Sequence, residues 1–269
     1  MKRFFTIFTL LALIFIQSVS NAQETKSCTG INFDLGGDLY SRYVWRGTQF
    51  GGNAPSIQPY ASMAVGNLEL GFWGAYSLSG WNTGQELDLY LSYSFLDEMF
   101  SVAFTDYFFP DVLADYNYFD YAAPTTGHIF EGSLSFNGTE KIPFTFLAAI
   151  NFFGADAAKI ESDPTSPNFN TKTGLLYSSY FEAGYSKTIK SVDFSAFVGF
   201  TLTSPQEVDS NTGYIGETGF YGSKAGVVNT GISLSKEIEI TEKYSLPISA
   251  SVIANPDTKK MFFILGISF

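Results

Sequence analysis

Apolar and polar residues alternate along twelve stretches of this chain. Such alternation is typical of β-strands whose two faces meet different environments. About ten residues let a tilted strand cross a bilayer, with lipid-facing and lumen-facing side chains taking turns. In the clearest stretch, residues 31–47, the odd positions are mostly apolar or aromatic and the even ones mostly polar. The expected strands cover approximately 31–47, 56–66, 68–78, 86–95, 100–108, 128–136, 143–153, 175–188, 192–203, 225–238, 244–254 and 260–269.

The connections between these strands alternate between long and short. The short ones lie at 66–67, 96–99, 137–142, 189–191 and 239–243, and the longer ones around 48–55, 79–85, 109–127, 154–174 and 204–224. Outer-membrane barrels have short periplasmic turns and long extracellular loops. We therefore predict an all-β fold, a closed antiparallel transmembrane β-barrel of about twelve strands, located in the bacterial outer membrane. A soluble β-sandwich also alternates, but it has no reason to keep this rhythm of loop lengths.

Both ends of the chain carry signals that are typical of proteins exported to the outer membrane. Residues 1–22 resemble a secretory signal peptide, with a charged start, an apolar middle and small residues before the cleavage site. Residues 23–30 then form a short periplasmic segment, and residues 31–269 form the barrel. The final strand ends on Phe269. An aromatic residue there resembles the terminal-strand signal read by the barrel-assembly machinery, so we expect that machinery, and outer-membrane lipid, as partners.

The composition narrows the possible functions. The chain is 45% hydrophobic, yet its mean hydropathy is only +0.08, as expected when apolar residues are spread over many strands. Without Lys2 and Arg3, its 15 basic residues become 13, against 26 acidic ones, a net charge of −13. This charge argues against nucleic acid as a partner. A single cysteine leaves no internal disulfide to stabilise the fold.

Aromatic residues fall near the predicted strand ends, where transmembrane barrels carry interfacial girdles. We expect girdle positions for Tyr43, Trp45, Tyr76, Tyr93, Phe95, Phe108, Phe152 and Tyr177.

One motif resembles a known family. The run 41–49, which includes Tyr43, Trp45, Arg46 and Gly47, is similar to the opening motif of the TorF (Gcw_chp) family of outer-membrane porins. The similarity continues through Pro55, Gln58, Tyr60, Gly71, Trp73 and Gly74 to residues 86–90 and Tyr93, and departs from the family at glycine positions such as Ser92. The resemblance covers about residues 35–95 and implies an outer-membrane barrel with a pore, but no particular substrate.

Strand parity places ten charged residues in the lumen, because charges facing lipid cost a few kcal/mol each. They are Asp34, Asp38, Arg42, Arg46, Glu69, Glu86, Asp88, Glu131, Glu182 and Asp193. Eight acids against two arginines predict a narrow passive diffusion channel for small polar solutes that favours cations. In this interpretation Arg42 and Arg46 oppose Glu86 and Asp88 at a constriction. Alternatively, these charges form an internal network that fills and stiffens the barrel.

Other functions have less support. A closed barrel with partner-binding or adhesive outer loops is one alternative. A hydrolase is another, but the single histidine, His128, is expected at the barrel rim, and neither GxSxG nor HExxH occurs. An acid protease-like barrel that uses paired aspartates stays open, and the place to look for it is the acidic, aromatic stretch that contains Asp106, Asp111, Asp115 and Asp120. One cysteine and one histidine do not make a typical zinc site, so we expect no metal. Since the catalytic motifs are also missing, we expect no enzyme activity and no cofactor.

Overall fold

The computed structural model describes residues 30–79, 85–110, 117–123, 125–242 and 244–269. The predicted signal peptide and most of the segment 23–30 lie outside these ranges. Every regular element in the described residues is a β-strand. The described residues contain no helix that is long and apolar enough to cross a membrane.

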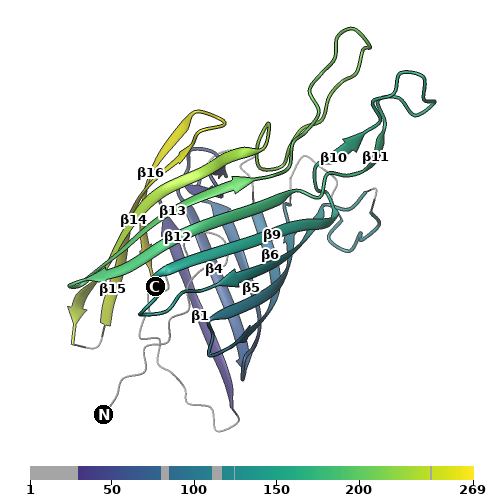
Figure 1. Ribbon diagram of the computed structural model, residues 1–269. Coiled ribbons are helices and arrows are strands. Elements are labelled where there is room, and N and C mark those ends of the chain that lie inside the picture. Colours follow the sequence, from purple (N-terminus) through teal and green to yellow (C-terminus); the bar gives the residue numbers. More distant parts are fainter. Residues whose placement is uncertain (1–29, 80–84, 111–116, 124, 243) are drawn as a thin grey trace.

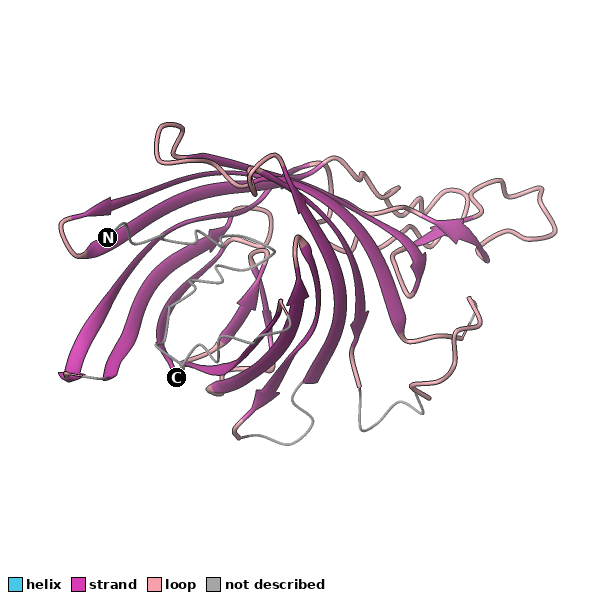
Figure 2. Cartoon of the chain, turned by 90° about the horizontal axis from the view of Figure 1, so that it is seen from below, coloured by secondary structure: helices cyan, strands magenta, loops and turns pink. Residues whose placement is uncertain are grey.

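Twelve antiparallel strands close into one barrel (Figures 1 and 2). The order around the barrel is β1, β16, β15, β14, β13, β12, β9, β8, β7, β6, β5 and β4, with β4 returning to β1. The predicted fold class and strand number are therefore confirmed. The barrel strands are β1 (Ile31–Tyr40), β4 (Ser56–Val65), β5 (Leu68–Ser77), β6 (Gln85–Phe95), β7 (Phe100–Phe108), β8 (His128–Phe136), β9 (Phe144–Gly154), β12 (Ser179–Ile189), β13 (Val192–Thr201), β14 (Gly226–Thr241), β15 (Tyr244–Asn255) and β16 (Lys260–Ser268).

The outer surface of the barrel is apolar. Alternate residues of the strands point outward and keep much of their side-chain surface exposed, which is the arrangement a lipid-facing wall requires. Examples from strands around the barrel are Phe33, Leu35, Leu70, Leu91, Phe104, Leu134, Phe146, Ile150, Ile232, Leu234, Met261, Phe263 and Leu265, all between 42% and 73% exposed. A soluble sandwich would bury these side chains, so that alternative is excluded.

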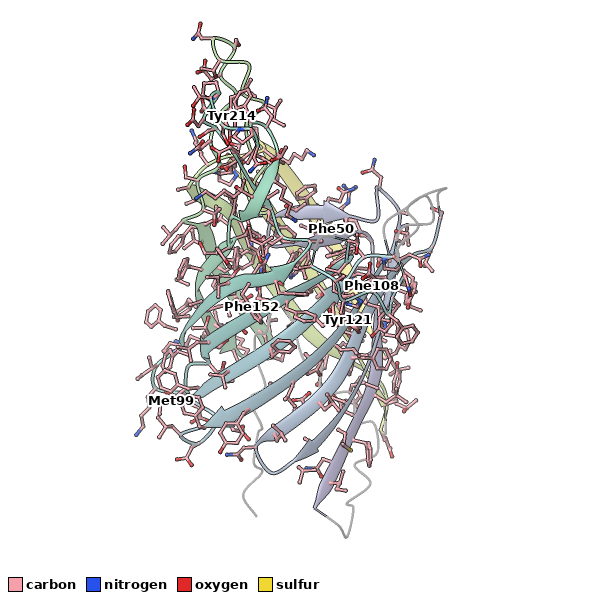
Figure 3. All side chains as sticks on the ribbon, turned by 90° about the vertical axis from the view of Figure 1, so that its right-hand side faces the viewer. Phe50, Met99, Phe108, Tyr121, Phe152 and Tyr214 are labelled. Carbon is pink, nitrogen blue, oxygen red and sulfur yellow. The ribbon has the colours of Figure 1, made fainter. Side chains whose placement is uncertain are left out.

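The connections sort to the two ends of the barrel as predicted. The long ones gather at one end, here called the long-loop end, and tight turns close the other, the turn end (Figure 1). At the long-loop end the hairpin formed by β10 (Ala158–Ile160) and β11 (Lys172–Leu175) projects together with the loop 202–225. Asn170 joins the two by hydrogen bonds to Gly213 (2.9 Å) and Ile215 (3.0 Å), and Tyr214 lies far out on this projection (Figure 3).

The expected first strand is wrong beyond Tyr40. The barrel strand β1 ends there, and residues 43–50 form a separate hairpin of β2 (Tyr43–Trp45) and β3 (Thr48–Phe50). The turn between them uses Arg46 and Gly47, both with positive φ (46° and 79°). Positive φ at both central residues is the mark of the type I′ turn, which suits a two-residue hairpin. The alternation over residues 31–47 thus covers two separate strands, the wall strand β1 and the short strand β2 of this hairpin.

Candidate functional site

The hairpin 43–50, here called the plug hairpin, lies across the barrel lumen. Its Tyr43 hydroxyl donates to Glu86 on β6 at 2.5 Å, while the Gly47 carbonyl at its tip accepts from Asn255 on β15 at 3.1 Å. Arg46 reaches Glu131 on β8. These contacts fall on widely separated strands of the wall, so the hairpin spans the lumen, while its second strand, Thr48–Phe50, stays partly exposed. Residues 43–47 are all buried.

The two faces of the plug hairpin pack against different parts of the wall. Val44 joins an apolar cluster with Ile253, Phe262 and Ile264, on β15 and β16. The opposite face carries aromatic rings: Tyr43 lies 5.5 Å from Trp73, centroid to centroid, and Trp45 packs against Tyr107, Phe220 and Tyr221.

The girdle prediction is therefore wrong for Tyr43 and Trp45, which are each only 3% exposed and lie inside the barrel. Parity within one long strand had placed them outside, but the chain leaves the wall after Tyr40. Phe108, 5% exposed, is also covered. Tyr76, Tyr93, Phe152 and Tyr177 keep 37–55% of their surface, as expected for outward positions.

Arg46 forms the central ion pair of the lumen. Its guanidinium donates hydrogen bonds to both carboxylate oxygens of Glu131, from Nη2 to Oε1 at 3.0 Å and from Nη1 to Oε2. Two-point contact of this kind is the strongest geometry for such a pair. The Tyr107 and Tyr221 hydroxyls each donate to Glu131 at 3.0 Å. Burial raises the pKa of the Tyr221 phenol well above its ordinary value, so it stays neutral and also accepts from Arg46.

Aromatic rings surround the same guanidinium. Its central carbon lies 4.6 Å from the Trp45 ring centroid, 4.5 Å from that of Tyr180 and 5.3 Å from that of Tyr221. Cations are attracted to ring faces within about 6 Å. The Tyr180 hydroxyl continues the network to Glu182 on the same strand and accepts from Asn229 at 2.9 Å. Arg46 is therefore fully enclosed by one carboxylate and three rings.

Glu86 and Asp88 lie beside this network without a cation of their own. Both project inward from β6, and they are only 1% and 6% exposed. The two side chains form a hydrogen bond with each other, and Glu86 Oε1 and Asp88 Oδ1 have no hydrogen-bond partner among the other described residues. The prediction that Arg42 and Arg46 oppose this pair is wrong, since Arg46 pairs with Glu131 and Arg42 Nη1 donates to Gln49 at 3.1 Å. Parity could not foresee that Arg46 would sit on a turn inside the lumen and pair with Glu131 on β8.

The remaining lumen candidates lie apart from this group. Asp38 is buried and accepts from Ser268 at 2.5 Å, and Glu69 accepts from Tyr90 at 2.8 Å. Asp34 is exposed, as is Asp193, whose carboxylate accepts from Thr188 at 2.6 Å next to a tight turn. The structure thus brings together five of the ten predicted residues: Arg46, Glu86, Asp88, Glu131 and Glu182.

Residues that sequence reasoning missed complete the site. They are Trp73, Tyr107, Tyr180, Tyr221 and Asn229, all buried around the plug hairpin. Strand parity gave a signal for four of them. Trp73, Tyr107 and Asn229 have the opposite parity to the outward Leu70, Phe104 and Ile232, and Tyr180 shares the parity of Glu182. Tyr221 comes from the loop 202–225, where no periodicity exists to place it.

Phe269 helps to close the barrel. Its backbone N–H and carbonyl each bond to Gly37 of β1 at 2.9 Å, and its ring is 51% exposed. The barrel thus closes between the last strand and the first. Recognition of this residue by assembly machinery stays a prediction.

His128 lies on the outer wall and is covered by residues from the loop 109–127. Its Nδ1 is 2.7 Å from Asp106 Oδ1, its Nε2 is 2.7 Å from the Tyr118 carbonyl, and the Tyr121 ring stacks on it at 4.4 Å. A rim position was expected, but the side chain is fully buried. Because a carbonyl oxygen only accepts, Nε2 carries a proton and donates to Tyr118, so His128 is not free to act as a base in this arrangement. Asp111 and Asp115 of this loop lie outside the described residues. Among the described residues no group of three or more His, Cys, Asp or Glu side chains is placed to hold a metal.

The closed strand ladder, the apolar outer wall and the charged lumen define the class: this is a bacterial outer-membrane β-barrel.

No family model matches the chain, and no curated protein matches it either, so the resemblance to the TorF family stays a prediction. Two structures of OprD, an outer membrane protein of Pseudomonas aeruginosa, are 14% identical over 90% of this chain, with TM-scores of 0.36 and 0.33. Wzi of Escherichia coli, an outer membrane protein involved in group 1 capsule assembly and described as a carbohydrate-binding β-barrel, is 12% identical over 89%, with a TM-score of 0.33. The chain spans 56% to 66% of the length of these proteins. The class assignment rests on this chain's own strands.

Gly47→Ala is expected to loosen the plug hairpin. The positive φ of 79° costs an L-residue about 1–2 kcal/mol, and a Cβ there would overlap the Val228 carbonyl oxygen. Proteolysis of folded protein in detergent should then cut within 41–55 in the variant and not in the parent. Gly174→Ala, where no atom lies within 4 Å of the new Cβ, is the control. Equal resistance of all three proteins would show that the turn does not hold the hairpin in place.

Proposed function

We propose that this protein is a narrow outer-membrane diffusion channel for small polar solutes that favours cations, and that the plug hairpin forms its constriction. The observation that carries the proposal is a charge imbalance in the lumen. Four carboxylates, those of Glu86, Asp88, Glu131 and Glu182, surround the plug hairpin, while Arg46 is the single arginine among them and is already paired. A confined lumen focuses the field of uncompensated charges, so cations enter more readily than anions.

The filled lumen favours a channel that conducts little while the plug hairpin is seated. It also favours the second candidate, a closed barrel that binds a partner through its outer loops. That alternative draws on the projection formed by β10, β11 and the loop 202–225, which is ordered by its own hydrogen bonds. A hydrolase has no support from the described residues, because the one histidine is fully engaged.

The reversal potential under a salt gradient tests the cation preference. We expect the parent protein in planar bilayers to select cations, and Glu86→Gln with Asp88→Asn to weaken that selectivity. The preference should also fade in high salt, because the Debye length falls from about 10 Å at 0.1 M to about 3 Å at 1 M. Glu140→Gln with Asp163→Asn, both exposed outside the lumen, is the matched control. Anion selectivity of the parent would overturn the proposal.

A further inference from the structure

Two carboxyl groups of the lumen, those of Glu86 and Asp88, share a hydrogen bond with each other but have no cation as a partner in the fold. Both side chains are almost fully enclosed, and Glu86 Oε1 and Asp88 Oδ1 receive no hydrogen bond from any other described residue. Burying a polar group without a partner costs about 1–3 kcal/mol, and more for a charge. Native proteins rarely carry that cost without a purpose, so the free oxygens point to a ligand that supplies hydrogen-bond donors.

The surroundings of the pair indicate what kind of donor it would take. In the strand register Asp88 lies opposite Trp73 on one side and Tyr107 on the other. The Tyr43 ring packs on Trp73, and the Tyr43 hydroxyl donates to Glu86. Carboxylates combined with aromatic faces bind cations that carry N–H groups, because the oxygens accept hydrogen bonds and the rings attract positive charge.

The neighbouring Arg46 is an example, within this protein, of a cation held by a carboxylate and aromatic rings. Its guanidinium is bound by one carboxylate, Glu131, and by the faces of Trp45, Tyr180 and Tyr221. The Glu86–Asp88 pair offers carboxyl groups and aromatic rings in a similar combination.

We propose that Glu86 and Asp88 form a binding site for the guanidinium or primary-ammonium group of a small organic cation. The proposal deepens and rests on the proposed channel function, since it names a class of solute for the constriction. Glu86 Oε2 already accepts from Tyr43, so a bound cation competes with the plug hairpin for this carboxylate. Binding and displacement of the hairpin are therefore coupled.

Calorimetry on the full protein in detergent tests the site with methylguanidinium as the probe. Tetramethylammonium has the same charge but no N–H donor, so it is the control ligand. We expect saturable binding of methylguanidinium only. Glu86→Gln with Asp88→Asn should weaken it by roughly tenfold or more, and Glu140→Gln with Asp163→Asn should not change it. Tyr43→Phe keeps the ring and frees the carboxylate, so it should tighten binding.

The outcomes separate this proposal from the channel. Equal binding of both cations, or unchanged binding in the Glu86–Asp88 variant, would overturn the site even if the protein conducts. Binding without any conductance would instead refute the channel and leave the site intact. If the double variant does not fold, as judged by heat-modifiable migration, Glu86→Gln alone replaces it. The site is then tested by two results together: weaker binding in Glu86→Gln and tighter binding in Tyr43→Phe. Weaker binding by Tyr43→Phe would also contradict the proposal.

Discussion

Arg46→Ala is expected to destabilise the folded barrel by about 3–5 kcal/mol, because it leaves the Glu131 carboxylate buried without its cation. The measurement is the denaturant midpoint of the protein in detergent, followed by the loss of heat-modifiable migration. Arg42→Ala is the matched control: this arginine is only partly buried and donates to Gln49, so its loss should cost less than about 1 kcal/mol.

A second variant separates the ion pair from the packing of the side chain. Arg46→Ala with Glu131→Gln removes the unpaired charge and should recover part of the lost stability. If Arg46→Ala and Arg42→Ala cost the same, the buried pair does not hold the plug hairpin.

Removal of the plug hairpin is expected to open the lumen. Replacing residues 43–50 with a flexible Gly/Ser linker takes away Tyr43, Trp45 and Arg46, the side chains that reach the wall on β5, β6, β7, β8 and β12. The wall itself keeps all twelve strands, so the barrel should still assemble. Single-channel conductance in planar bilayers should rise several-fold over the parent, because a filled cross-section becomes an aqueous one.

The control for this experiment is a linker of the same length in place of residues 163–170, within the outer projection. That variant removes loop residues and leaves the lumen intact, so its conductance should match the parent. A barrel that stays closed without the plug hairpin would contradict the constriction. The function would then move to the outer loops, where the projection around Tyr214 is the surface to test for a binding partner.

The lumenal acids Glu86 and Glu131 show how far strand parity reaches. A strand has a period of two, and charge facing lipid is costly, so each acid could be assigned to the lumen from its immediate neighbours alone. Which cation each acid meets was not predictable in this way. Arg46 lies 85 residues before Glu131, and their pairing depends on where the chain turns inward.

The residues after Tyr40 show where local pattern fails. Alternation continues with few breaks from β1 into the plug hairpin, so the pattern does not distinguish a wall strand from short strands inside the lumen. The Arg46-Gly47 turn was a local signal for the hairpin, since glycine favours the positive φ that a type I′ turn needs. It did not indicate that the hairpin would enter the barrel.

The sequence by itself determined the class of fold, the number of wall strands, the lipid-facing side of each strand and the end that carries the long loops. These features follow from short-range rules, because a bilayer fixes the length of a strand and forces apolar residues onto one face. Only the tertiary structure decided what fills the lumen. The plug hairpin is placed by contacts with strands far away in the chain, such as Tyr43 with Glu86 and Gly47 with Asn255, and no local pattern encodes such pairings.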